Sequence, residues 1–147
     1  MDILVGMHKL EGGCHCGNIH MDVALPRAPG EYRPRACDCD FCTKHAAAYL
    51  SDPQGSFSIH IGDAAKAARY RQGSGQAEFL ICTACGTLIG VSFAEGGHLY
   101  GAANAHAFEG GKPFGAEQPV SPRTLSAGEK AKRWQDVWFP DVRITGL

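Results

Sequence analysis

The chain has 147 residues, 44% of them hydrophobic and 20% charged, and a formal net charge of −1. These values are typical of one folded domain with its own core and exclude a chain that is disordered throughout. The near-zero charge and the absence of a basic run argue against nucleic acid or an anionic membrane as a partner. No apolar stretch approaches the ~20 residues of a membrane helix, and no secretory signal is recognisable, so we expect a cytoplasmic protein without a membrane segment.

Runs of alternating apolar and polar residues, separated by glycine and proline, predict a mainly β domain. The expected strands, in chain order, are 19–25, 57–62, 67–71, 77–82, 87–93 and 98–104. RQGSGQ at 71–76 predicts a turn, and the two runs on either side of CTACG at 82–86 predict a hairpin. One helix is expected near the end of the chain, where Ser126 followed by Glu129 fits a capping box.

The seven cysteines carry the strongest functional signal because they fall into two pairs and one triplet. They are Cys14 and Cys16 in CHC, Cys37, Cys39 and Cys42 in CDCDFC, and Cys82 and Cys85 in CTAC. An odd number of thiols in a reducing compartment favours metal ligation over disulfides. A structural zinc takes four tetrahedral ligands, so the two pairs can close one site and the triplet leaves a ligand position open.

Local geometry supports this grouping. Residues i and i+2 of a strand point to the same side, so Cys14 and Cys16 can reach one ion. The same holds for the first two cysteines of the triplet, which Cys42 would join through a turn. Gly17 and Gly86 each follow a cysteine pair, where a positive φ would cost little. Unliganded buried thiols are the alternative for the two pairs.

The triplet is the expected catalytic site. Zinc removes the proton from a coordinated thiol, and the resulting thiolate can attack an aldehyde carbonyl to form a hemithioacetal. One alternative is a second structural zinc whose fourth ligand is His45 or a distant histidine. Another is an iron–sulfur cluster.

Several polar residues near the cysteines are weaker candidates. Asp38 and Asp40 could orient ligands or move a proton, or simply cap a turn. Lys44 could meet a substrate carboxylate and His45 could carry a proton, although a solvent-exposed surface is the plainer interpretation of both. His15 should point away from the ion that its neighbours bind. Three aromatic residues are expected in the core or in a pocket wall: Phe41, Phe79 and Trp134.

GGCHCG at 12–17, CDCDFC at 37–42 and CTACG at 82–86 resemble the three cysteine motifs of the glutathione-dependent formaldehyde-activating family, also called the centromere-protein-V/Gfa domain family. The resemblance covers residues 9–140 and makes 1–8 and 141–147 tails. It implies an Mss4-like β-tent of small zinc-stapled sheets with one short C-terminal helix. It also implies two zinc ions, with the ligands divided as above: Cys14, Cys16, Cys82 and Cys85 for the structural ion, and Cys37, Cys39 and Cys42 for the active-site ion.

The resemblance further implies a carbon–sulfur lyase that joins glutathione and formaldehyde as S-hydroxymethylglutathione, or releases them again. The expected partners are therefore a glutathione-like thiol and a small aldehyde. Two other hypotheses stay open at this point: a non-catalytic, zinc-stabilised binding module, and a thiol-based metal carrier or redox sensor. The sequence predicts neither the glutathione-binding residues nor an oligomeric state.

Overall fold

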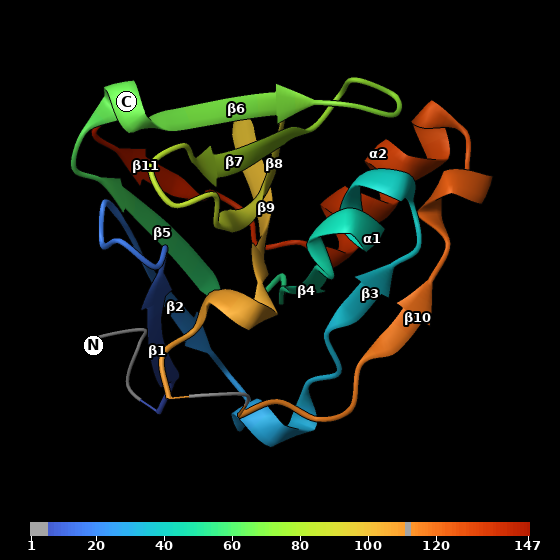
Figure 1. Cartoon of the computed structure of the whole chain (residues 1–147). Coiled ribbons are helices and arrows are strands. Elements are labelled where there is room, and N and C mark those ends of the chain that lie inside the picture. Colours follow the sequence, from blue (N-terminus) through green and yellow to red (C-terminus); the bar gives the residue numbers. More distant parts are fainter. Residues whose placement is uncertain (1–5, 111–112) are drawn as a thin grey trace.

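A computed structural model describes residues 6–110 and 113–147, which form two β-sheets and two α-helices (Figure 1). The first sheet has the order β1-β2-β5-β11, with bounds His8–Gly13, Ile19–Leu25, Ser56–Ile61 and Arg143–Thr145. The second has the order β10-β3-β4-β9-β8-β7-β6, with bounds Gln118–Val120, Arg35–Cys37, Ala48–Leu50, His98–Asn104, Leu88–Glu95, Glu78–Cys82 and Ala67–Arg71. The helices are α1 (Asp40–His45) and α2 (Ala127–Val137), and four 3-10 turns lie at Pro29–Glu31, Ala64–Lys66, Ala105–Ala107 and Pro122–Thr124.

The prediction of a mainly β fold is confirmed, and all six predicted strands are present. The strands that the sequence did not predict are β1 and the three-residue strands β3, β4, β10 and β11, which are too short to show an alternating pattern. Strand β11 lies within residues 141–147, which were expected to be a tail, and its Ile144 pairs with Ile59 of β5. This end of the chain therefore contributes an edge strand to the first sheet.

The predicted helix is confirmed as α2, together with its capping box. The Ser126 hydroxyl accepts a hydrogen bond from the Glu129 N–H at 3.1 Å, and the Glu129 carboxylate accepts one from the Ser126 N–H at 2.9 Å. Each bond satisfies an N–H group that would otherwise lack a partner in the first turn. Helix α1, by contrast, was not predicted.

The central strands of the second sheet are buried on both faces. Leu80, Ile89 and Ala103 belong to a core shared with the first sheet, and the preceding residue of each strand belongs to a second core. That second core also contains Cys42 of α1 and Trp138 at the end of α2. Since successive residues of a strand point to opposite faces, the second sheet lies between the first sheet and the helices (Figure 1).

Gly12 of β1 lies against the backbone of the segment after β9, with which it forms an isolated bridge at Phe108. A Cβ atom at this position would lie 2.3 Å from the Ala107 carbonyl oxygen and 2.8 Å from the Phe108 Cα. We therefore expect Gly12→Ala to lower the free energy of unfolding by about 1–3 kcal/mol, measured by urea denaturation. Gly128→Ala in α2 is the control, because nothing lies within 4 Å of the added carbon and alanine favours a helix by up to about 1 kcal/mol. Equal stabilities of the two variants would contradict the prediction.

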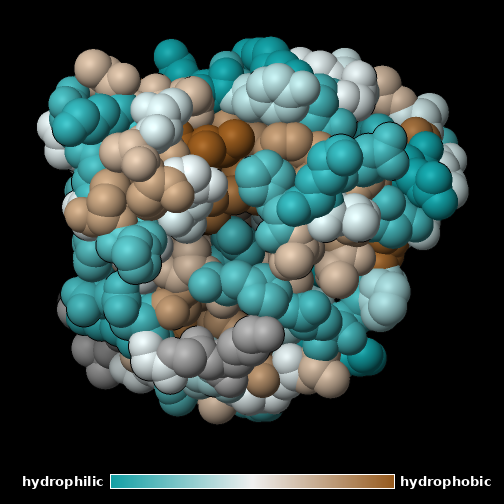
Figure 2. Space-filling view, in the orientation of Figure 1, coloured by the Kyte–Doolittle hydropathy of each residue, from teal (hydrophilic) through white to brown (hydrophobic). Residues whose placement is uncertain are grey.

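No helix in the described part of the chain is long and apolar enough to cross a membrane. The face seen in Figure 2 is mostly hydrophilic, and hydrophobic side chains are visible inside a hollow bordered by hydrophilic ones.

Candidate metal centres and the adjoining cavity

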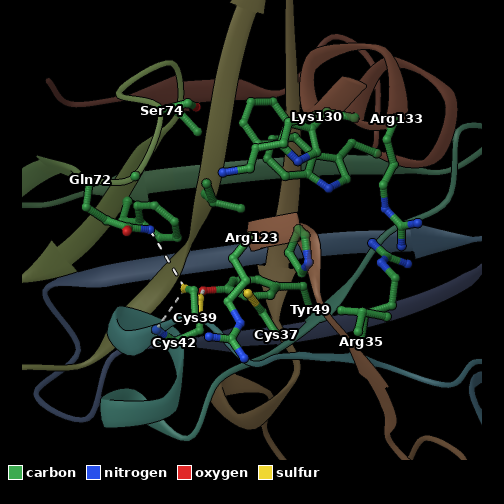
Figure 3. Close-up of a pocket in the computed structure, with 18 of the residues that line it drawn as sticks. Arg35, Cys37, Cys39, Cys42, Tyr49, Gln72, Ser74, Arg123, Lys130 and Arg133 are labelled. Atoms are coloured by element: carbon green, nitrogen blue, oxygen red, sulfur yellow. Dashed lines mark hydrogen bonds between the residues drawn. The ribbon is translucent and has the colours of Figure 1, made fainter. Parts of the chain in front are cut away.

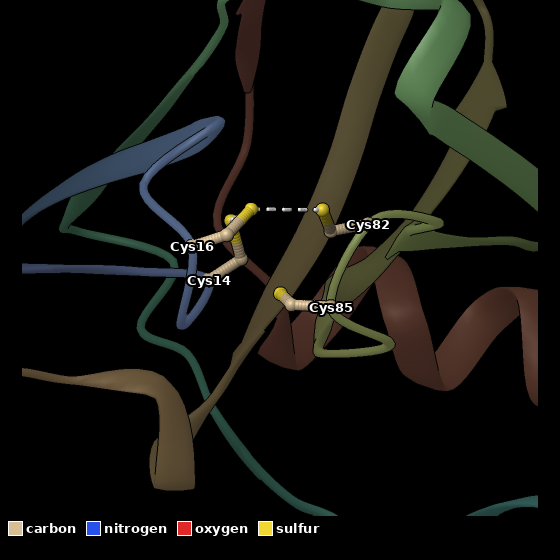
Figure 4. A group of neighbouring side chains, drawn as sticks. All are labelled: Cys14, Cys16, Cys82 and Cys85. Carbon is tan, nitrogen blue, oxygen red and sulfur yellow. Dashed lines mark hydrogen bonds between the residues drawn. The ribbon is translucent and has the colours of Figure 1, made fainter.

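The two cysteine pairs come together from two tight turns. Cys14 and Cys16 lie in the turn between β1 and β2, and Cys82 and Cys85 lie at the turn between β7 and β8 (Figure 4). Both turns close in the same way: the N–H of the first cysteine donates to the carbonyl five residues later, at Ile19 in one turn and at Thr87 in the other. The four sulfur atoms lie within 4.8 Å of one another.

The spacing of these sulfurs suits a tetrahedral metal ion. Cys16 Sγ lies 3.6 Å from Cys14 Sγ and 3.6 Å from Cys82 Sγ. Sulfurs bound tetrahedrally at ~2.3 Å from a zinc ion lie roughly 3.8 Å apart, whereas a disulfide requires ~2.05 Å. All four cysteines are free. The donor set and its geometry therefore fit a closed four-thiolate zinc site.

The local structure that orients Cys14 and Cys16 differs from the prediction. Residues 14–18 lie outside β1 and β2, so a turn and not the side of a strand aims Cys14 and Cys16 at the same point. The positive φ expected at the two glycines is confirmed, with +86° at Gly17 and +82° at Gly86. These conformations are unfavourable for residues that carry a Cβ atom. The glycines thus allow each turn to close tightly behind its cysteines.

Within this group, hydrogen bonds favour a thiolate at Cys85, whereas those from the neighbouring thiols help to raise the pKa of Cys16 to about 11. The Thr87 hydroxyl lies 3.3 Å from Cys85 Sγ and, with backbone N–H donors from Cys16 and Thr87, lowers the pKa of the Cys85 thiol to about 5. The N–H of Ile19 donates to Cys14 Sγ at 3.2 Å. The donors around Cys85 stabilise the deprotonated form of sulfur that a metal ion binds.

The triplet is built by the passage from β3 into α1. Cys37 is the last residue of β3, Cys39 is the N-cap of α1, and the buried Cys42 lies in the first turn of that helix. Cys39 Sγ accepts a hydrogen bond from the Cys42 N–H at 3.4 Å. The prediction that Cys37 and Cys39 share one strand was therefore wrong: the strand ends at Cys37, and the helix brings Cys42 back toward it. The three sulfurs lie within 4.8 Å of one another.

Two thiols of the triplet, Cys37 and Cys42, have pKa values that are shifted in opposite directions. A hydrogen bond from the Cys42 thiol, together with the N–H of Cys39, lowers the pKa of Cys37 to about 6. The same hydrogen bond and burial raise the pKa of Cys42 far above its ordinary value. Burial, reinforced by the neighbouring Cys42, raises the pKa of Tyr49, so its hydroxyl stays protonated 3.1 Å from Cys42 Sγ. Tyr49 can therefore donate a hydrogen bond to a Cys42 thiolate.

The triplet opens onto a cavity of about 300 Å³, the lower end of the range for small-molecule sites (Figure 3). All three cysteines line the cavity, whereas none of the four cysteines of the other group does. One wall is aromatic: the rings of Trp134 and Trp138 stack with centroids 4.9 Å apart and an interplanar angle of 15°. The two cysteine groups therefore differ in their surroundings: the triplet lines a cavity, whereas the four-cysteine group does not, and its Cys16 is exposed.

The polar lining of the cavity is mainly cationic. The residues that carry positive charge are Arg35, Arg123, Lys130 and Arg133, while Asp40 is the carboxylate among the lining residues in the described part of the chain. Burial, and secondarily the charge of Arg133, lowers the pKa of Arg35 to about 10, which still leaves it charged at neutral pH. The cavity is thus suited to an anionic ligand.

Asp38 and Asp40 differ in their relation to the cavity, because Asp40 lines it and Asp38 does not. Asp38 accepts a hydrogen bond from the Ser121 hydroxyl at 2.6 Å and pairs with Arg123 at 3.3 Å. It therefore fixes Arg123 at the cavity rim. Asp40, the first residue of α1, lines the cavity and is exposed.

The other polar candidates are exposed side chains that do not line the cavity. Lys44 and His45 are exposed and do not line the cavity, and the His45 ring packs against Phe41 at 4.6 Å. His15 is also exposed. Phe79 and Trp134 line the cavity as expected, and Phe41 packs against Phe79 at 4.6 Å.

Sequence reasoning missed the residues that reach the cavity from distant segments. They are Arg35, Tyr49, Gln72, Ser74, Arg123, Lys130, Arg133 and Trp138. RQGSGQ at 71–76, expected as a plain turn, supplies two of them, and Gln72 Nε2 lies 3.9 Å from Cys39 Sγ. The charges on α2 offered one signal, because Lys130, Arg133 and Trp134 are spaced three and four residues apart and so share a helix face.

A third group that could hold a metal consists of Glu11, His20 and Asp22 on an exposed face of the first sheet. Its members already pair with one another, and His60 also pairs with Asp22 at 3.3 Å. It faces solvent and borders no cavity described above.

We expect Tyr49→Phe to weaken metal binding at the triplet by roughly tenfold or more, because the change removes the hydrogen bond to Cys42. Competition with a chromophoric zinc chelator measures the affinity, and circular dichroism checks the fold. Tyr100→Phe is the matched control, because Tyr100 packs against the same core and its hydroxyl bonds to no cysteine in the described residues. An unchanged affinity in Tyr49→Phe would show that the phenol does not support the ligand.

Comparison with known proteins agrees with these motifs. The model of the family described as glutathione-dependent formaldehyde-activating enzyme matches residues 9–111, more than half of the chain. A crystal structure of a Rhodobacter sphaeroides protein is 27% identical, with a TM-score of 0.52, over 71% of this chain and 92% of that one. Among curated proteins, none matches. The resemblance seen in the three cysteine motifs is thereby confirmed, and the chain belongs to the glutathione-dependent formaldehyde-activating enzyme family.

Proposed function

We propose that the protein is a zinc-dependent carbon–sulfur lyase that joins glutathione, or a related thiol, to formaldehyde or another small aldehyde, and catalyses the reverse reaction. The observation that carries the proposal is the position of Cys37, Cys39 and Cys42 in the wall of a cavity large enough for a small molecule. Membership of the family supports glutathione and formaldehyde as the substrate classes. Seven free cysteines are also compatible with a reducing cytoplasm.

The residues of the triplet fit zinc, since three convergent sulfurs are a donor set that this metal prefers. Zinc bound there would offer a fourth ligand position and lower the pKa of a thiol that occupies it. The four-cysteine group would hold a second zinc with a structural role only. We thus assign Cys37, Cys39 and Cys42 to catalysis and Cys14, Cys16, Cys82 and Cys85 to stability.

In the proposed reaction, the substrate sulfur forms a bond to the aldehyde carbon while the carbonyl π bond breaks. The carbonyl oxygen takes up a proton and becomes the hydroxyl of the adduct, and the thiol proton is released, so that no oxidant or reductant is needed. The protein orients the reactants: Tyr49 holds Cys42, Gln72 approaches Cys39, and the stacked tryptophans exclude water from one side. The reverse reaction expels the aldehyde from the same sulfur.

Exchange spectroscopy by NMR tests the proposal. We expect the zinc-loaded protein to accelerate the exchange of 13C-formaldehyde between its hydrate and its adduct with glutathione, and the metal-free protein to be inactive. The control is zinc chloride at the same concentration without protein. An exchange rate that is the same with and without the loaded protein would refute this function.

A further inference from the structure

Two arginines stand together in the cavity, away from the three cysteines in the view of Figure 3. Arg35 extends from β3 and Arg133 from α2, and both side chains are partly buried. Neither has a carboxylate within 4.0 Å in the described part of the chain. Two neighbouring positive charges in a partly desolvated space repel each other, and an anion between them would offset this repulsion.

Arg35 is held in place even without a ligand. Its guanidinium donates a hydrogen bond to the Ser51 hydroxyl, which in turn donates to the Val137 carbonyl at 2.6 Å. This short chain of bonds links β3 to the last turn of α2, the helix that carries Arg133. A fixed guanidinium loses little conformational freedom when it binds, and its planar donors match a carboxylate.

The arginine pair lies a short distance along β3 from the cysteine triplet. Arg35 and Cys37 are two residues apart on β3, so their side chains leave the same face of the strand with origins roughly 6.6 Å apart. The stacked rings of Trp134 and Trp138 line the same cavity and offer an apolar surface to the atoms that join the ligand's two ends.

We infer that the ligand of this cavity carries a carboxylate that is clamped between Arg35 and Arg133 while its sulfur or carbonyl group reaches the cysteine triplet. The inference deepens the proposed function and rests on it for the reacting end of the ligand, but not for the anionic end. The carboxylate belongs either to the thiol or to the aldehyde. Arg35 and Arg133 are then the residues that determine substrate specificity.

Calorimetric titration with S-methylglutathione tests the clamp, because this probe keeps both carboxylates and has no free thiol. We expect Arg133→Gln to weaken its binding on the order of ten- to a hundredfold, the effect of losing a charge-assisted hydrogen bond. Lys132→Gln removes one positive charge from the next residue of α2, which is exposed and does not line the cavity, and we expect it to bind within twofold of the unmodified protein. Arg35→Lys, which keeps the charge but loses the planar fork, should weaken binding as Arg133→Gln does.

Two further arms of the experiment separate the sources of the carboxylate. The ethyl ester at the glycine carboxylate of S-methylglutathione tests whether that carboxylate is the one clamped. If it is, the ester should bind the unmodified protein weakly, and Arg133→Gln should weaken the binding of the ester little further. Glyoxylate replaces the probe in the second arm, and a loss of its binding in Arg133→Gln assigns the carboxylate to the aldehyde. The inference is overturned if Arg133→Gln and Arg35→Lys bind both S-methylglutathione and glyoxylate as tightly as Lys132→Gln does. Failure of the clamp would not affect the NMR exchange that tests the proposed function. Conversely, an absence of exchange would not affect the effect of the arginine variants on binding.

Discussion

Replacing Cys42 with serine is expected to lower the rate of exchange between glutathione and its formaldehyde adduct at least about a thousandfold, while the protein stays folded. Cys42 is one of only three sulfurs at this position, and a serine hydroxyl is a poor zinc ligand at neutral pH. Its removal should release about one of two zinc ions per chain. The NMR exchange rate, zinc content by atomic emission and thermal unfolding provide the three measurements.

The matched control is Thr43→Ala, the next residue of α1, which is exposed and should keep both zinc ions and the exchange. Global unfolding of Cys42→Ser would mean that the triplet holds a second structural ion, as in the hypothesis of a non-catalytic zinc-stabilised module. Full activity with one zinc ion per chain would place the chemistry elsewhere. A redox sensor would instead lose and regain the zinc of the triplet on mild treatment with peroxide followed by a thiol reductant.

Cys82→Ser, unlike Cys42→Ser, should unfold the protein. Cys82 is fully buried, and its sulfur lies 3.6 Å from that of Cys16, a residue 66 positions earlier in the chain. An ion at this site joins the β1–β2 turn to the β7–β8 turn. Structural zinc contributes on the order of 10 kcal/mol, which is comparable to the whole stability of a typical domain of about 5–15 kcal/mol. We therefore expect the variant to lack a cooperative thermal transition at 25 °C and above.

Thr83→Ala is the control for this variant, since Thr83 is an exposed neighbour in the same turn. A chelator added to the unmodified protein should remove the zinc of the three-cysteine site first, with loss of activity, and the zinc held by four cysteines later, with unfolding. A Cys82→Ser protein that melts at the same temperature as Thr83→Ala would show that the four-cysteine group does not stabilise the fold.

The two cysteine groups, which could each hold a metal ion, could be predicted from the sequence because their geometry is largely local. Each cysteine pair is separated by one or two residues and followed by a glycine, and the observed positive φ of Gly17 and Gly86 is a property of the turn itself. The same is true of the Ser126–Glu129 capping box, whose two hydrogen bonds span three residues. Strand β2 has the predicted bounds because buried and less buried residues alternate along most of its length, as the pleat requires.

Helix α1 was missed because it has six residues, too few for a helical period, and because a cysteine and not serine, threonine, aspartate or asparagine caps it. Strands β3, β10 and β11 have three residues each, and their existence depends on partners elsewhere in the chain. No window of the sequence contains that information. For the same reason, residues 141–147 gave no sign that they would complete the first sheet.

The division of the sulfurs into a group of four and a group of three follows from residue type and short spacing, both of which are visible in neighbouring residues. Three features emerged only from the folded chain: the triplet lines a cavity, Tyr49 contacts Cys42, and Arg35 and Arg133 line the same cavity from distant segments. A cavity and the charges around it are made by side chains from strands and a helix that pack together only in the folded chain, so no single stretch of the sequence contains them.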